Sequence, residues 1–138
     1  MYPLSPEDLR DLMSGRMPRL AVGTLPLEVR RHFGRSEDKV FLSSESVVHI
    51  LEKHGEHIGY EELLLIPKIL EAGLWIGEFN RPEWCSASLF LEDENRRLLA
   101  AIKVTKDRRE SFVATLHQAK PRQIRSKMRR GIILRQHW

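Results

Sequence analysis

The apolar residues of this chain change their spacing about halfway along the sequence. Before Leu74 they recur every three or four positions between capping residues, and from Leu74 onward they alternate with polar residues. The first spacing is typical of helices with one buried face, and the second is typical of strands with one buried face. Helices followed by strands predict an α+β fold, in which N-terminal helices pack on a roughly four-stranded antiparallel sheet, a meander.

The boundaries of these elements are indicated by residues that start or stop regular structure. Ser5-Pro6-Glu7-Asp8 has the pattern of a helix start, with a capping serine, a proline in the first turn and early acidic residues. Glycine follows most of the helical segments and predicts their ends. A first short helix is predicted to begin after Ser5, and further helices are predicted at 27–33, 44–54, 60–65, 67–72 and 121–130. The predicted strands span 20–23, 39–42, 74–79, 85–91, 98–105, 111–119 and 132–134.

Length and composition favour one domain. The chain has 138 residues, 41% of them hydrophobic and 30% charged, so residues 1–138 are expected to share one core. Within this domain, residues 1–19 are predicted to form an N-terminal helical extension, and residues 20–138 are predicted to form the core with its basic C-terminal helix. The sequence shows no membrane span and no secretory signal. Together with the single Cys85, this predicts a cytoplasmic protein.

Charge is distributed unevenly along the chain. Residues 1–95 carry 10 Lys/Arg against 17 Asp/Glu, a balance of −7, whereas residues 96–138 carry 13 against 2, a balance of +11. Clustered cations bind phosphates and release counterions, so the basic third predicts a polyanionic partner such as tRNA or another structured RNA. A solvated basic helix without a ligand is the alternative. The cations assigned to nucleic-acid binding are Lys120, Arg122, Arg125, Lys127, Arg129 and Arg130.

Alternation within the meander predicts which residues share a face of the sheet. The apolar positions are odd in the strand 85–91 and even in the two strands that follow it. Burying all of them on one side predicts that Ile102 pairs with Leu116 and that Leu89 pairs with Ala100. The same parity places Phe112 on the buried face.

The opposite face of the meander is predicted to carry polar residues. The predicted register sets Lys103 between Thr115 and Ser86, with His117 one step along the neighbouring strand. An ordinary solvated sheet face is the alternative interpretation. Cys85 falls on the buried face, where a thiolate is disfavoured, so it is not expected to be a nucleophile. The predicted polar patch comprises Ser86, Ser88, Lys103, Thr115 and His117.

Three of the six histidines lie in one short segment, at His49, His54 and His57. Their spacing lacks the ligand pattern of a zinc site, so no metal is predicted. Histidine titrates near neutrality and acts as a general base or acid, and His54 lies at the predicted end of a helix, where it is both held and accessible. The alternative for His49 is a half-buried helical residue that packs or caps, and for His57 a surface loop residue.

Cleaving RNA without a metal requires a base for the 2′-hydroxyl and an acid for the leaving 5′-oxygen. It also requires donors or cations for the phosphorus oxygens and a basic surface for the strand. The residues available for these roles are His54, His49 or His117 as base and acid, Lys103, Thr115 and Ser86 as stabilisers, the basic helix as the binding surface, and Phe90, Trp84 and Trp138 for base stacking.

Several segments resemble a known nuclease group. They are Val22-Gly-Thr-Leu-Pro26, Val40-Phe-Leu-Ser43, Val48-His-Ile-Leu-Glu-Lys-His54 and Leu65-Ile-Pro-Lys-Ile-Leu70, followed by the meander. Together, over roughly residues 20–130, they resemble the phage- or prophage-borne members of the barnase–EndoU–colicin–RelE-like (BECR) nucleases, which are small toxin-type ribonuclease domains.

The resemblance implies N-terminal helices on a four-stranded antiparallel sheet and metal-independent RNA cleavage on the exposed sheet face. Families of this group use a His, a Lys or Arg, and a Ser or Thr. The matching positions here are His54 or His49, Lys103 and Thr115, with His117 nearby.

The sequence therefore predicts an endoribonuclease of toxin or prophage type that uses no cofactor. Its partners would be RNA and an immunity or phage protein, with no membrane. Two alternatives are a nucleic-acid-binding module without catalysis and a phage protein-interaction domain.

Overall fold

The computed structural model describes residues 2–34, 37–91, 96–107 and 110–136. These residues form an α+β fold whose seven strands make one mixed, mostly antiparallel sheet. No helix among them is long and apolar enough to cross a membrane. In chain order the elements are α1 (Pro6–Ser14), β1 (Arg19–Thr24), α2 (Leu27–Phe33), β2 (Lys39–Ser43), α3 (Ser44–His54), α4 (Tyr60–Leu63), α5 (Ile66–Ala72), β3 (Leu74–Gly77), β4 (Trp84–Leu91), β5 (Arg96–Val104), β6 (Ser111–Ala119), α6 (Pro121–Arg130) and β7 (Ile132–Arg135).

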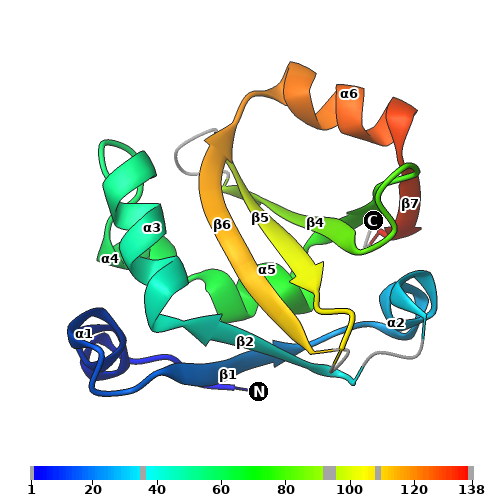
Figure 1. Cartoon of the computed structure of the whole chain (residues 1–138). Coiled ribbons are helices and arrows are strands. Elements are labelled where there is room, and N and C mark those ends of the chain that lie inside the picture. Colours follow the sequence, from blue (N-terminus) through cyan, green and yellow to red (C-terminus); the bar gives the residue numbers. More distant parts are fainter. Residues whose placement is uncertain (1, 35–36, 92–95, 108–109, 137–138) are drawn as a thin grey trace.

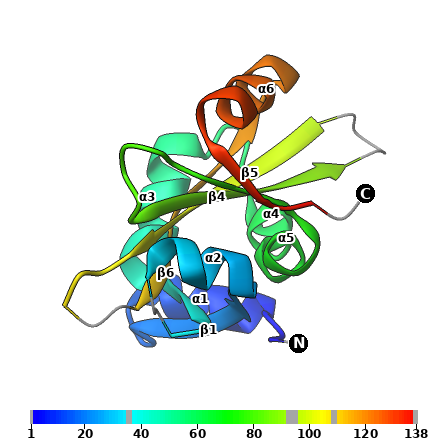
Figure 2. The same ribbon diagram turned by 90° about the vertical axis from the view of Figure 1, so that its right-hand side faces the viewer.

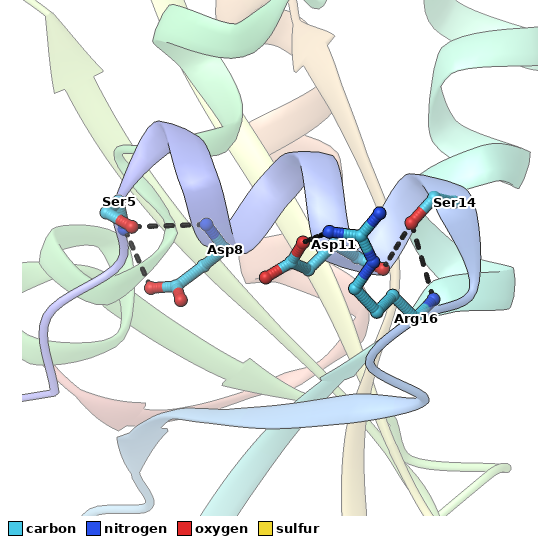
Figure 3. A network of polar contacts seen from close by, with 5 residues as sticks. All are labelled: Ser5, Asp8, Asp11, Ser14 and Arg16. Carbon is cyan, nitrogen blue, oxygen red and sulfur yellow. Dashed lines mark hydrogen bonds and ion pairs between the residues drawn. The ribbon is translucent and has the colours of Figure 1, made fainter.

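The helix boundaries follow from their capping residues, as α1 illustrates (Figure 3). The Asp8 backbone N–H donates to Ser5 Oγ at 3.1 Å, and the Ser5 backbone N–H donates to the Asp8 carboxylate at 3.0 Å. These bonds satisfy donors that the first turn leaves without partners. At the other end Gly15 has a φ of 77°, a left-handed conformation that glycine adopts without strain.

The sheet is larger than the sequence predicts. The four strands β3 to β6 form the expected antiparallel meander, but the full order is β1-β2-β6-β5-β4-β3-β7. The predicted α+β class is confirmed, but the sheet has seven strands rather than roughly four, and the pairing of β2 with β6 is parallel rather than antiparallel. The hairpin of β1 and β2 joins the meander through a short parallel pairing of β2 with β6, and β7 pairs with β3 at the other edge.

The helices divide between the two faces of the sheet (Figures 1 and 2). Helices α1 to α5 contribute to the main core, and α1 supplies its fully buried Leu9 and Leu12 to it. The described segment before β1, residues 2–18, thus contributes to the core of the domain. On the opposite face, α6 is the only helix within the described residues, and its Ile124 and Met128 pack against a small cluster of β-strand residues that includes Leu99.

The register of the meander has the predicted parity between β4 and β5 but is shifted by two residues. Leu89 pairs with Leu98 rather than with Ala100, and Lys103 pairs with Trp84 rather than with Ser86. A shift of two keeps the same side chains on the same face, which is why the hydrophobic pattern does not distinguish the two registers.

A β-bulge in β6 changes the alternation of its side chains. Ala101 pairs with Thr115, but the next residue, Ile102, pairs with Val113, so Ala114 is the extra residue. Val113 is consequently buried in the core. The prediction that Phe112 points into the core is wrong, because the bulge turns Phe112 to the other face, opposite Lys103.

Candidate functional site

The end of α3 meets β6 and brings two histidines together. Helix α3 packs along β6 (Figure 1), and the Gln118 side chain donates a hydrogen bond of 3.4 Å to the backbone oxygen of His57, just beyond the helix. His54 ends the helix, and its ring centroid lies 5.4 Å from that of His117, with 31° between the ring planes. The two imidazoles are within reach of one small bound group.

Both histidines of this pair hold their protons less tightly than free histidine does. Burial is the main cause of the lowered pKa of His117, and the nearby charges of His54 and Lys127 lower it further. Burial also lowers the pKa of His54, followed by the charges of Lys53, His49 and His57. Each imidazole is therefore largely neutral at pH 7, the form that accepts a proton.

Hydroxyl side chains flank the histidine pair on the same face of the sheet. Thr115 lies two residues before His117 on β6, and Ala101 separates it from Ser86 on β4. The Oγ atoms of Thr115 and Ser88 are buried without a hydrogen-bond partner among the described residues. Such groups are rarely left unpaired in a folded protein, so they are available to a ligand or to ordered water.

Lys127 of α6 connects this row to a cavity. Its Nζ lies 3.7 Å from the Glu78 carboxylate, and its charge acts on His117. The cavity has a volume of about 240 Å³ and lies between α6 and the β3–β4 connection. Its polar lining includes Ser86, Glu78, Arg81, Lys127 and Arg130.

Three predicted site residues are placed differently from the expectation. Ser86 is only 3% exposed, on the face of the sheet that α6 covers, rather than on an open face. Lys103 is exposed but lies one row further along the sheet than Thr115, beside Trp84. His49 is exposed on α3. The structure thus brings together His54, His117 and Thr115. Lys103 lies one row away on the sheet, and His49 lies on the exposed side of α3, where its charge still lowers the pKa of His54.

The predicted binding cations lie on or next to α6. Lys120, just before the helix, is exposed, as are most of the basic residues within it, and Lys127 is half-buried. Ile124 and Met128 turn the apolar stripe of the helix toward the sheet, so its cations face outward. The exposed cations are Lys120, Arg122, Arg125, Arg129 and Arg130.

Sequence reasoning missed two residues of the cavity, Glu78 and Arg81. Both lie at the β3–β4 connection, which the sequence marks only as a break at Arg81-Pro82. Their ion pair, 4.0 Å long, is local to that connection, whereas the contact of Glu78 with Lys127 depends on where α6 crosses the sheet. No spacing within the sequence encodes that crossing.

Within the described residues, no cluster of three or more His, Cys, Asp or Glu side chains is arranged to hold a metal ion. Cys85 is buried, and burial raises the pKa of its thiol, so a thiolate nucleophile is excluded there as predicted. Comparisons with protein-family models, curated proteins and solved structures find no match to this chain. The resemblance to the BECR nucleases stays a prediction.

Proposed function

We propose that the protein is a metal-independent endoribonuclease that cleaves RNA by attack of the 2′-hydroxyl on the adjacent phosphorus. The proposal rests on one observation, the approach of the His54 and His117 rings to 5.4 Å beside the basic helix α6. This cleavage needs a base and an acid at one phosphate. Two imidazoles at such a separation supply both.

The chemistry divides between the two rings. A neutral imidazole takes the 2′-hydroxyl proton while that oxygen bonds to phosphorus. A protonated imidazole gives its proton to the 5′-oxygen while the bond from phosphorus to that oxygen breaks, which leaves a 2′,3′-cyclic phosphate and a 5′-hydroxyl. A charge on either ring disfavours a charge on the other, so the pair favours one proton over two.

Neighbouring residues would stabilise the charge that develops on the phosphorus oxygens. The ammonium group of Lys127 acts on His117 and is only half-buried, so it can also face a phosphate at the pair. Thr115 offers a hydroxyl without a partner among the described residues. The outward-facing cations of α6 would hold the rest of the strand through its phosphates.

The test is cleavage of labelled RNA in the presence of EDTA. We expect products that end in 2′,3′-cyclic phosphate, and no cleavage where a 2′-deoxy nucleotide replaces the attacking one. His54→Ala and His117→Ala should each lower kcat/KM by about 100-fold or more, the usual contribution of a general base or acid. His57→Ala, at an exposed histidine just beyond α3, is the matched control. It should keep most of the wild-type rate, because the charge of His57 is the smallest of the causes that lower the pKa of His54. Wild-type cleavage by both site variants would overturn the proposal.

A second candidate is a nucleic-acid-binding module without catalysis. The observation that favours it is α6 itself, which bears its cations on the face turned away from the sheet and needs no histidine to bind phosphates. This function predicts RNA binding that weakens steeply with salt and no turnover in EDTA. The same cleavage assay therefore separates the two candidates.

A further inference from the structure

A row of cations and aromatic rings crosses the part of the sheet that α6 leaves open. It follows the pairing of β4, β5, β6, β2 and β1, perpendicular to the strands. Trp84 is opposite Lys103, Lys103 is opposite Phe112, and Phe112 is opposite Phe41. We call this row the cation–aromatic strip, and it comprises Arg81, Trp84, Lys103, Phe112, Phe41 and Arg19.

Contacts within the strip bring each cation against a ring. The guanidinium carbon of Arg81 lies 4.9 Å, and Lys103 Nζ 5.5 Å, from the Trp84 ring centroid. At the other end the Phe41 and Phe112 rings are 5.8 Å apart, and the guanidinium carbon of Arg19 lies 4.1 Å from the Phe41 centroid. Such contacts hold both partners in place on the sheet surface.

The strip is accessible and its charges are only partly neutralised. The three cations are exposed and the three rings are half-buried. Arg19 pairs with Glu110 at 2.7 Å and Arg81 contacts Glu78 at 4.0 Å, whereas Lys103 has no ion pair among the described residues. An open hollow of about 610 Å³ beside the strip is lined in part by Lys103 and Phe112. A ligand in this hollow can therefore reach the exposed part of the Phe112 ring and the positive charge of Lys103.

The strip belongs to the same face of the sheet as the histidine pair. Lys103 lies four residues along β5 from Leu99, which is the residue opposite His117. At the usual rise of a strand, four residues correspond to about 13 Å. One short stretch of polymer can reach from the strip to the histidines.

We propose that the strip binds single-stranded RNA, with bases stacked on Trp84 and on the Phe112 and Phe41 rings, and phosphates near Lys103, Arg81 and Arg19. Base stacking explains the rings and phosphate binding explains the cations between them, a combination that single-strand-binding surfaces use. This inference rests on the proposed function and adds the form of the substrate. Because a duplex hides its base faces, the strip selects unpaired segments.

The experiment measures binding of a 12-nucleotide single-stranded RNA to His117→Ala protein, in which cleavage does not interfere. Trp84→Leu and Phe112→Leu should each weaken binding at least about fivefold, the lower end of what stacking on an aromatic residue contributes. Trp84→Phe keeps a ring and should retain most of the affinity, which separates stacking from misfolding. Tyr60→Leu removes an exposed ring on α4, outside the strip, and should leave binding unchanged.

Two further probes identify the ligand. Single-stranded DNA of the same sequence should bind the strip in the same way without being cleaved, since stacking does not require the 2′-hydroxyl. A duplex RNA should bind more weakly, and its affinity should not depend on Trp84.

The outcomes separate the strip from the proposed catalysis. If the His117→Ala protein binds RNA equally well with and without Trp84→Leu or Phe112→Leu, the proposed role of the strip is overturned, even if wild-type protein cleaves RNA. Fivefold losses in these variants would support the strip, even if wild-type protein cleaves no RNA in EDTA, and in that case only the catalytic proposal fails.

Discussion

His54 and His117 titrate as a pair, because each ring carries its charge close to the other. Burial is the main cause of the lowered pKa of both, and the charge of His54 lowers the pKa of His117 further. The protons therefore leave in two steps that belong to the pair. Catalysis by such a pair requires the singly protonated state and gives a bell-shaped dependence on pH.

Replacing one ring should be visible in the titration of the other. In His54→Ala the pKa of His117 should rise, since one of the charges that lowers it is removed, while the burial that mainly lowers it stays. In cleavage assays the optimum of kcat/KM for the wild-type protein should lie below about pH 6.5, the pKa of free histidine. The His117 titration is measured by the NMR shift of its ring protons. An unchanged or lower His117 pKa in the variant would contradict the pairing.

The buried histidines should make the fold sensitive to mild acid. His32, His54 and His117 all have lowered pKa values in the folded state, mainly through burial. Between those values and about 6.5 the unfolded chain binds more protons than the folded one, so the free energy of unfolding falls as pH decreases through this range. Urea titrations at pH 7.5 and pH 5.5 measure the change. Greater stability at pH 5.5 would contradict the prediction.

His32 of α2 fixes how that helix lies on β3. Its ring covers Gly77, where a built Cβ atom would be 2.7 Å from the imidazole Cε1. Only glycine allows this approach, so Gly77→Ala should destabilise the fold by about 1–3 kcal/mol, the usual cost of overpacking. The double variant with His32→Ala should lose less stability than the sum of the single changes, because the clash is removed. Additive losses in denaturant titrations would show that the close approach is not the cause.

Helix ends are the part of the fold that the sequence predicts best. Ser5, Gly15 and Ser43 act locally, through hydrogen bonds and backbone conformations within a few residues, and the structure places caps at all three. Strand pairing depends on distant residues, and the hydrophobic pattern of β4 and β5 is satisfied equally by two registers. Among the described residues, β2 joins β6 through two residue pairs, which are too few to leave a recognisable hydrophobic pattern in the sequence.

The candidate site could be predicted only in part for the same reason. The alternation of side chains correctly places Lys103, Thr115 and His117 on one face of the sheet. The capping pattern correctly places His54 at the end of a helix, but the approach of that helix end to His117 is seen only in the structure. The helix that covers Ser86 crosses the sheet through tertiary contacts that no local spacing encodes. The cavity residues at the β3–β4 connection were missed because that crossing creates the cavity.

The uneven charge of the chain becomes one basic surface because α6 turns its cations away from the sheet. RNA affinity should therefore fall steeply as salt concentration rises. Neutralising three exposed cations of α6, with Arg122→Gln, Arg125→Gln and Arg129→Gln together, should reduce the slope of log affinity against log salt by about 2, at roughly 0.7 for each phosphate contact on a single strand.

The control for this prediction is a second triple variant with the same change in net charge. Arg10→Gln, Arg31→Gln and Lys68→Gln remove three exposed cations from α1, α2 and α5, the helices on the far side of the sheet. Its salt slope should match that of the wild-type protein. Equal slopes for the two triple variants would indicate that net charge, rather than the surface of α6, determines binding.

The bulge at Ala114 has a consequence for how this protein can diverge. The bulge lies between Phe112 and His117. On the face that carries both residues, the residue numbers are therefore even before Ala114 and odd after it. Deleting Ala114 would restore strict alternation and leave Phe112, Val113 and His117 on the faces that they occupy now. The bulge therefore lets an even-numbered ring and an odd-numbered imidazole share one surface, and inserting a further residue between them would turn one of the two to the other face.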